Sequence, residues 1–386
     1  ARYPVANALG TLVPAIVLSV AGPVWTGKWI GVGLLASGAL AAWALGRAVD
    51  ERDAWARGAI LVATLVVSSS FWNGYIGFQI GVTLALALGA VWVRTGPLAP
   101  WSLAVGSVVL FFAHAVPFAV CALFAGLDAL RRRDGARLAA LLPSAGLAIW
   151  YVSARLLAPE AGVSLFGGAG SIGRHLVHTA YTFTKLGPFQ HPDRLNGSGI
   201  LAGAPVAYWA AVGLSVAFVA VLAMALLRGT LSLPPGGQRR AALFGWAVLA
   251  SSVLVPPFAF QVVNPGERVA VMGALILLAT VPLAARFRFV LGVAALVFLV
   301  DDAASLAAQS RGLPSEAVEA AYADRAEREV SPESAAAYDV TSVPAPEAAP
   351  LFGHPVLLHS DRYLAAERED WTRRTFETGL LLPEAD

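Results

Sequence analysis

Long apolar stretches, separated by short polar ones, occupy the chain as far as residue 303. They are rich in Ala, Leu, Val and Gly and do not alternate between apolar and polar positions, which favours helices over strands. Several pass the length of roughly 18 residues that a membrane span requires, and isolated strands cannot satisfy their backbone polar groups in lipid. The predicted helices cover residues 5–22, 28–46, 58–73, 75–93, 101–130, 138–157, 205–227, 241–258, 269–284 and 288–303.

This pattern predicts an all-α polytopic membrane protein with about 9–11 membrane helices, including a short hairpin. Residues 1–303 form the predicted transmembrane helical domain, with an outer loop at 158–204. Residues 304–386 form an acidic extracytoplasmic C-terminal segment. Because that segment is too small and too polar to build a large core alone, we expect it to dock on the outer loops.

The composition agrees with lipid as the solvent. Of all residues 57% are hydrophobic and 13% are charged, whereas about 25% are charged in a typical soluble chain. Cys121, the single cysteine, lies in an apolar stretch, which excludes a disulfide framework and a cysteine-based metal site. The sequence also lacks a phosphate-binding loop with its lysine, a GxGxxG turn opening a helix, HExxH and GxSxG.

The charges divide the chain in two. Residues 1–300 contain 20 Lys and Arg against 8 Asp and Glu, a net charge of +12, and residues 301–386 contain 7 against 17, a net charge of −10. The basic residues sit in short loops and form no stripe, so we expect no nucleic-acid partner. Loops rich in Lys and Arg face the cytoplasm. Those loops contain Arg47, Arg52 and Arg57; Arg131, Arg132, Arg133 and Arg137; Arg228, Arg239 and Arg240; and Arg286 with Arg288. The outer loop and the tail after Asp301 are therefore predicted to face outside.

The stretch 101–130 is compatible with either two membrane crossings or one. If Arg94 and Arg131 both lie inside, this stretch crosses the membrane an even number of times. Its middle, residues 112–117, contains His114 and Pro117, where a polar group and a helix breaker suit the apex of a hairpin. One long kinked helix, with a neighbouring loop assigned to the wrong side, is the alternative.

Polar residues inside apolar stretches are costly and therefore mark candidate functional sites. His114 is compatible with ligand binding or proton transfer, and equally with a neutral imidazole hydrogen-bonded to a neighbouring helix. Asn73, Tyr75 and Gln79 lie at the predicted outer end of a tight helical pair, where they would line a polar cavity. An interfacial aromatic belt around a glycine-mediated turn explains the same residues as well.

The outer loop concentrates cations and histidines. These residues are Arg174, His175, His178, Lys185, His191, Asp193 and Arg194. His175 and His178 lie one helical turn apart, but no third ligand has a suitable spacing, so we expect no metal there. A cationic cluster at the level of the lipid headgroups would bind phosphate. An ordinary solvated loop is the alternative interpretation.

Arg268 follows Glu267 in a short outer loop, at the mouth of the next predicted helix. A guanidinium there would grip the phosphate of a membrane-embedded substrate. A snorkelling interface anchor, or a local pair with Glu267, explains the same position. Asp301 and Asp302 end the last predicted helix and would hold that end in water.

Several features, in this order, are similar to those of a known enzyme class. They are Tyr3–Leu9 with the apolar stretch up to Pro23, Leu45–Arg47, Phe71–Phe78, the hairpin with His114, the basic loop Arg131–Arg133, the long outer loop, and Glu267–Arg268. In this order they resemble the multi-spanning glycosyltransferases of the GT-C class, as found in uncharacterised bacterial members, which use lipid-phosphate-linked sugar donors.

The resemblance implies inverting sugar transfer from a polyprenyl-phosphate-linked sugar on the extracytoplasmic face of the bacterial cytoplasmic (inner) membrane. A carboxylate would deprotonate the acceptor hydroxyl while the lipid phosphate leaves, stabilised by cations or a divalent metal. Arg268, Lys185 and Arg194 would bind the donor phosphate. The expected cavity-lining residues are Asn73, Tyr75, Gln79, His114 and His191.

The sequence departs from this class at its start. The class carries its catalytic acid in the first outer loop, after a first membrane helix, whereas this chain opens at Ala1 on what resembles the end of that loop. Either the loop lies upstream of the given sequence or catalysis has been lost. The remaining acids on the outer side are Glu160, Asp193, Glu267, Asp301 and Asp302. None matches the family base by position, so the catalytic residue stays unassigned.

Two further functions remain open. A non-catalytic subunit, or scaffold, of a larger membrane complex would explain the missing acidic loop. A transporter is also compatible with a polytopic chain, although the sequence has no inverted repeat and few paired charges within its apolar stretches.

Overall fold

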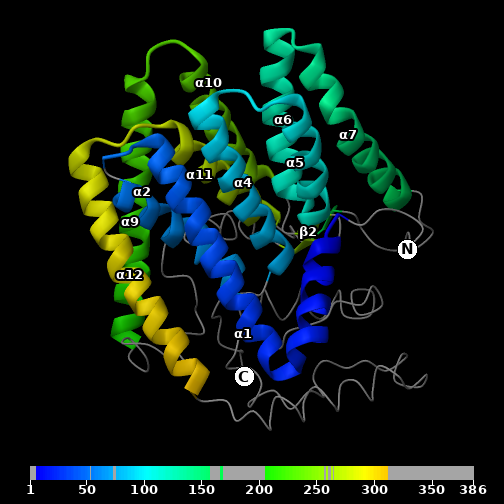
Figure 1. The fold of residues 1–386 in the computed structure, drawn as a ribbon. Coiled ribbons are helices and arrows are strands. Elements are labelled where there is room, and N and C mark those ends of the chain that lie inside the picture. The colour runs from blue at the N-terminus through cyan, green and yellow to red at the C-terminus, as the bar shows by residue number, and fades with distance from the viewer. Residues whose placement is uncertain are drawn as a thin grey trace.

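The computed structural model describes residues 6–52, 54–72, 75–156, 166–167, 205–255, 258–259, 262–263 and 265–311. Helices dominate these residues, so the predicted all-α fold is confirmed (Figure 1). They are α1 (Ala8–Val49), α2 (Ala54–Leu61), the π-helix η1 (Val62–Val66), α3 (Ser69–Trp72), α4 (Ile76–Thr95), α5 (Pro100–Ala113), α6 (Ala115–Arg132), α7 (Gly135–Leu156), α9 (Pro205–Ser232), α10 (Gly237–Ser251), the 3-10 helix η3 (Ser252–Leu254), α11 (Pro265–Thr280) and α12 (Ala285–Arg311).

The structure adds a small antiparallel sheet that the apolar pattern does not predict. β1 (Phe166–Gly167) pairs with β2 (Phe258–Ala259), which pairs with β3 (Val262–Val263). Each strand has two residues, too short for a period-2 pattern to be visible in the sequence.

Two of the predicted helices join. The stretches 5–22 and 28–46 form the single helix α1, which changes direction sharply (Figure 1) and has the two apolar segments Ala8–Ala21 and Trp25–Val49. Pro23 lies between these two segments in the sequence. Proline has no N–H and clashes with the preceding turn, which accounts for a bend rather than a straight helix.

The hairpin predicted within 101–130 is present. α5 ends at Ala113 and α6 begins at Ala115, and the two pack side by side (Figure 1). His114 between them has an extended backbone, and its Nδ1 accepts a hydrogen bond from the N–H of Val116 at 3.1 Å. The imidazole thus caps the new helix as an N-cap side chain does. Pro117 falls in the first turn of α6, where a missing N–H costs nothing.

Four helical segments of the described chain are long and apolar enough to cross a membrane: Trp25–Val49, Ile76–Thr95, Gly135–Ala154 and Gly213–Ser232. Ala8–Ala21, Ala54–Val66 and Pro100–Ala113 are apolar but shorter. These lengths do not establish the predicted number of about nine to eleven membrane helices, so that number stays a prediction.

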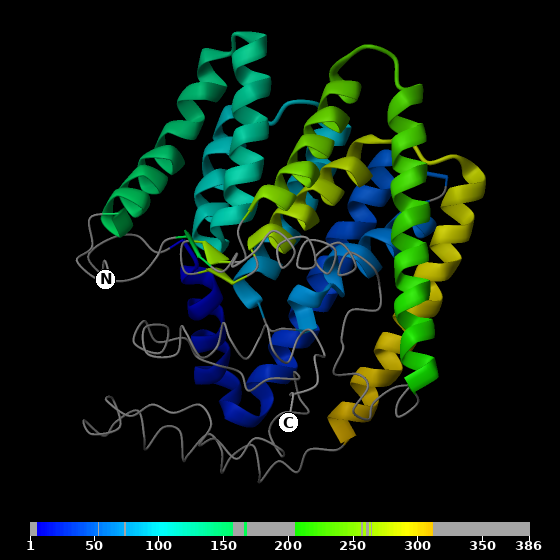
Figure 2. The same cartoon turned by 180° about the vertical axis from the view of Figure 1, so that it is seen from behind.

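The core of the described region surrounds α11. Every residue of this helix except Val269 is buried, as expected of a helix that is apolar on all sides. It packs most closely on α10, and also on α4 and α6. α1 packs along α4 and α2, whereas α7 lies at the periphery against α5 and α6 (Figures 1 and 2).

The loops that carry the predicted cytoplasmic arginines gather at one end of the molecule (Figures 1 and 2). We call this end the basic end, and it comprises the connections at residues 50–52, 96–99, 133–134, 233–236 and 281–284. The start of α4, the turn between α5 and α6, the end of α7, the start of α9 and the start of α11 lie toward the opposite end. The predicted outer loop and tail are therefore both attached to helices at that opposite end.

Candidate functional site

Arg268 is the centre of a cluster at the opposite end. It lies in the first turn of α11 and is 6% exposed. Its Cζ lies 4.3 Å from the ring centroid of Tyr75 and 5.9 Å from that of Phe78. A guanidinium at these distances is attracted to the aromatic faces. The turn before α4 and the start of α11, about 190 residues apart in the chain, thus meet at this arginine.

His114 belongs to the same cluster. It is buried, and its ring centroid lies 5.3 Å from that of Phe78 in an edge-to-face arrangement. Because Nδ1 accepts the hydrogen bond of Val116, the single ring proton of a neutral imidazole is on Nε2. His114 therefore presents a donor, rather than an acceptor, on its remaining nitrogen.

Gln79 lies one turn beyond Tyr75 on α4, and it is buried. Its Nε2 donates a hydrogen bond to the hydroxyl of Ser68 at 2.9 Å. This bond ties α4 to the bend between η1 and α3. The structure thus brings Tyr75, His114 and Arg268 together, and places Gln79 in the packing beside them.

Two acids of the opposite end are buried. Glu267 precedes Arg268 in the first turn of α11, where a carboxylate is favoured by the helix dipole. Asp302 is buried on α12, whereas Asp301 is only half-buried. Asp302 does not simply hold the helix end in water, because α12 continues past it to Arg311. Glu160 and Asp193 lie outside the described residues.

Close backbone packing holds the cluster in place. A Cβ built on Gly77 would lie 2.8 Å from the carbonyl oxygen of Ala113 and 1.7 Å from Oδ1 of Asn7. A Cβ on Gly81 would lie 2.8 Å from Pro117 Cγ. Only glycine allows α4 to approach the α5–α6 turn this closely. Asn7, directly before α1, is packed against Gly77 at the start of α4.

The small sheet brings the outer loop to this end. Residues 166–167 pair with 258–259, and 258–259 pair with 262–263, directly before α11. The other predicted site residues, Asn73, Lys185, His191 and Arg194, lie outside the described residues. Among the described residues, no group of three or more His, Cys, Asp or Glu side chains has a spacing suited to a metal ion.

Arg57 has a role that its sequence position did not reveal. We predicted that Arg57 belongs to a cytoplasmic loop, but it lies within α2 and is 1% exposed. Its Nη1 donates to the carbonyl oxygens of Leu278 and Val281, at 2.9 and 3.0 Å. It thus satisfies carbonyl groups at the end of α11, which have no partner inside the helix. Sequence spacing carries no signal for a contact over this separation.

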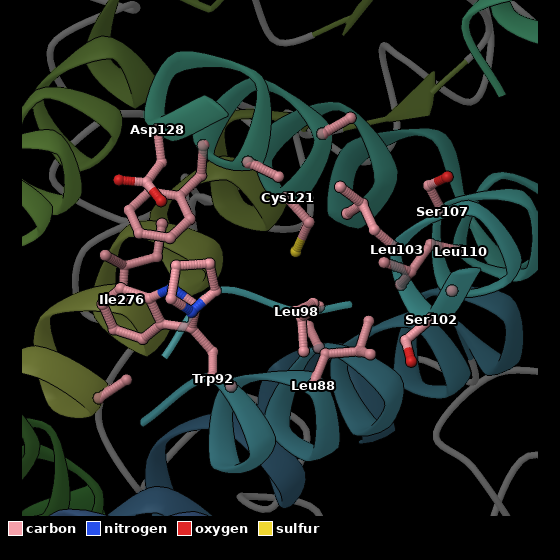
Figure 3. Close-up of a pocket in the computed structure, with 18 of the residues that line it drawn as sticks. Leu88, Trp92, Leu98, Ser102, Leu103, Ser107, Leu110, Cys121, Asp128 and Ile276 are labelled. Atoms are coloured by element: carbon pink, nitrogen blue, oxygen red, sulfur yellow. The ribbon is translucent and has the colours of Figure 1, made fainter. Parts of the chain in front are cut away.

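A partly open apolar cavity of about 110 Å³ was also not predicted. It lies between α4, α5, α6 and α11 (Figure 3), and its lining includes Pro97 and Leu98 from the connection 96–99 of the basic end. The thiol of Cys121 points into it, and Trp92 and Asp128 lie at one side (Figure 3). Tyr75, Gln79 and His114 are not among its lining residues. Glycine and alanine at several lining positions leave the space, and small residues in an apolar stretch are the only sequence signal for it.

Comparison with known proteins adds no relative: no family model, no curated protein and no solved structure matches the chain. The likeness to the GT-C class therefore depends on the quoted residues of this sequence alone, and it stays a prediction.

Proposed function

We propose that this chain is an integral protein of the bacterial cytoplasmic membrane that binds a polyprenyl-phosphate-linked sugar on the extracytoplasmic face and transfers the sugar. The observation that carries the proposal is the buried Arg268 at the start of α11, opposite the basic end.

The apolar surface supports membrane insertion. Trp101, Leu142 and Ile149 are among many large apolar side chains that are more than half exposed. A soluble monomer rarely exposes apolar surface on this scale, whereas lipid solvates it. The location of the basic loops at one end supports an orientation with that end in the cytoplasm.

The depth of the site supports a lipid-linked substrate. α5 has 14 residues, which span about 21 Å at a helical rise of 1.5 Å. A hydrocarbon layer is about 30 Å thick. With the start of α5 at the cytoplasmic surface, His114 lies within the layer, where a substrate with a long apolar tail arrives laterally.

The chemistry around Arg268 supports recognition of a phosphate. Its guanidinium provides planar paired donors for phosphate oxygens, and the start of α11 adds the positive end of a helix dipole. The Nε2–H of His114 is a further donor beside it. These groups would stabilise a leaving lipid phosphate as its charge develops.

Transfer also requires a proton acceptor for the attacking hydroxyl. Glu267 is buried in the same helical turn as Arg268. We assign it this role within the proposal, since Asp302 lies on α12, a different helix. Replacing Glu267 by Gln should therefore abolish transfer and leave donor binding in place.

The proposal is tested with purified full-length protein and a polyprenyl-phosphate sugar. Arg268→Ala should raise the donor KM by about 10–100-fold, the loss expected for a hydrogen-bonded charge. Arg268→Lys should restore part of it, since Lys keeps the charge without the planar fork. Arg47→Ala is the control, because Arg47 is exposed at the basic end.

Unchanged donor kinetics in a well-folded Arg268→Ala protein would remove this arginine from the site. Wild-type protein that turns over no such donor, and that co-purifies in fixed ratio with other membrane subunits, would replace the enzyme by a scaffold.

A further inference from the structure

The cavity between α4, α5, α6 and α11 has room for a hydrocarbon guest. Its volume is about 110 Å³, and its wall is formed almost entirely by carbon atoms of side chains such as Leu88, Leu110 and Ile276. An apolar cavity of about 150 Å³ stays dry and binds benzene. The space here is thus of the size that takes a short segment of an alkyl chain.

The rim of the cavity lies at the basic end and is held by charged groups. Arg137 on α7 donates from Nε to the carbonyl oxygen of Leu98 at 2.8 Å and from Nη2 to that of Pro97 at 3.4 Å. Its Nη1 also pairs with Asp134. Asp128, which lines the cavity, pairs with Arg132 at 2.8 Å. Both aspartates of the rim are thus neutralised by arginines.

Two further arginines follow Asp128 at the end of α6. Arg131 follows Asp128 by one helical turn on the same face of α6, and Arg133 caps that helix. Both side chains are exposed, and neither takes part in an ion pair among the described residues. The end of α6 and the start of α7, which carry the charged residues of the rim, therefore contain four arginines against two aspartates.

Arg133 occupies a backbone position that suits glycine. Its φ is 55°, the only positive φ of a non-glycine residue in the described chain. At such a helix end glycine is preferred, because a Cβ is strained there. An arginine at this strained backbone position indicates a functional role for its positive charge.

Lipid is the surrounding medium at this place, if the membrane insertion proposed above holds. Trp101 and Val105 on α5, and Leu123 and Leu127 on α6, are exposed apolar residues on the two helices that line the cavity. The inference below rests on that insertion and not on sugar transfer.

We propose that the basic end holds an anionic phospholipid. Arg131 and Arg133 bind its phosphate, and a segment of one acyl chain enters the cavity between α4, α5, α6 and α11. Cationic side chains at the cytoplasmic surface attract anionic headgroups. The apolar wall of the cavity would hold the acyl chain of the same lipid.

The headgroup contact is tested by native mass spectrometry of the full chain in detergent with dipalmitoyl phosphatidylglycerol or dipalmitoyl phosphatidylcholine. Phosphatidylglycerol should bind more tightly, and Arg131→Ala and Arg133→Gly should each weaken it about fivefold. Arg133→Gly relieves the backbone strain, so its thermal midpoint should not fall. Weaker binding with undiminished stability separates loss of the headgroup contact from loss of the fold.

The chain contact is tested with a filled cavity. Ala125→Phe places a ring in the space, because Ala125 lines it. Leu123→Phe is the matched control on the exposed face of the same helix. In the wild type and the control, dipalmitoyl phosphatidylglycerol should bind more tightly than the dihexanoyl form. In Ala125→Phe this preference should be lost.

Equal binding of the two headgroups, or an unchanged chain-length preference in Ala125→Phe, would overturn the proposal. Because binding is measured in detergent, such a result leaves the orientation and the sugar transfer proposed above untouched. Conversely, an inactive Arg268→Ala protein should still bind phosphatidylglycerol.

Discussion

Arg57, Arg133 and Arg268 have the same side chain but lie in three different environments. Arg57 is buried and bonded to backbone carbonyls, Arg133 is exposed on a strained backbone, and Arg268 is buried against aromatic rings. Burial of a guanidinium is costly unless hydrogen bonds or rings compensate it. At the residue scale, the surroundings of each arginine therefore define what it does.

The role of Arg57 is tested by Arg57→Met, which keeps an unbranched apolar stem and removes the donors of the guanidinium. Two hydrogen bonds from a charged group are lost, at roughly 1.5 kcal/mol each. The free energy of unfolding in a detergent denaturation titration should fall by about 3 kcal/mol. Arg47→Met is the control: its exposed pair with Glu51, at 3.6 Å, should contribute about 0.5 kcal/mol or less. Equal losses in both variants would contradict the capping role.

At the residue scale the sequence identified Arg268 as a cation in a short loop at the mouth of a helix. It identified His114, Tyr75 and Gln79 separately, as polar groups within apolar stretches. That signal is physical, because such groups are costly in lipid or in a core. It does not reveal which of them meet. Contacts such as Arg268 with Tyr75 join distant parts of the chain, and a single sequence contains no record of them.

At the element scale the apolar pattern predicted most of the helices, since stretches of this length leave no other solution for the backbone. The hairpin was predicted from Arg94, Arg131 and His114 through a side-of-membrane argument, and the break falls at His114. The bend of α1 and the division of 58–73 into α2, η1 and α3 were not predicted. The strands also escaped prediction, because each has two residues.

Helix packing gives a test at this scale. A Cβ on Gly273 of α11 would lie 2.7 Å from the backbone nitrogen of Leu249 on α10. Gly273→Ala should therefore separate these two helices and lower the thermal midpoint. Gly33→Ala in α1 is the matched control, since no atom lies within 4 Å of its added Cβ. It should be neutral or stabilising, by up to about 1 kcal/mol. A stable Gly273→Ala protein would contradict the close α10–α11 contact.

At the scale of the whole molecule, positive charge and the candidate site lie at opposite ends. The basic loops share one end, where Arg288 also pairs with Asp50 and links α12 to the connection after α1. The Arg268 cluster and the attachments of the outer loop and tail lie toward the other. The positions of the arginines along the chain predicted this separation of the basic loops from the Arg268 cluster. Such a prediction needs only the charge of each loop and the order of the helices.

The central claim is therefore that the basic end faces the cytoplasm and the Arg268 end faces outside. In a Cys121→Ser background, single cysteines replace Arg132 in the basic α6–α7 hairpin and Gly197 in the predicted outer loop. A membrane-impermeant thiol reagent is applied to intact cells and to permeabilised cells. We expect Gly197→Cys to react in intact cells and Arg132→Cys to react only after permeabilisation. Labelling of Arg132→Cys in intact cells, with Gly197→Cys protected, would contradict the claim.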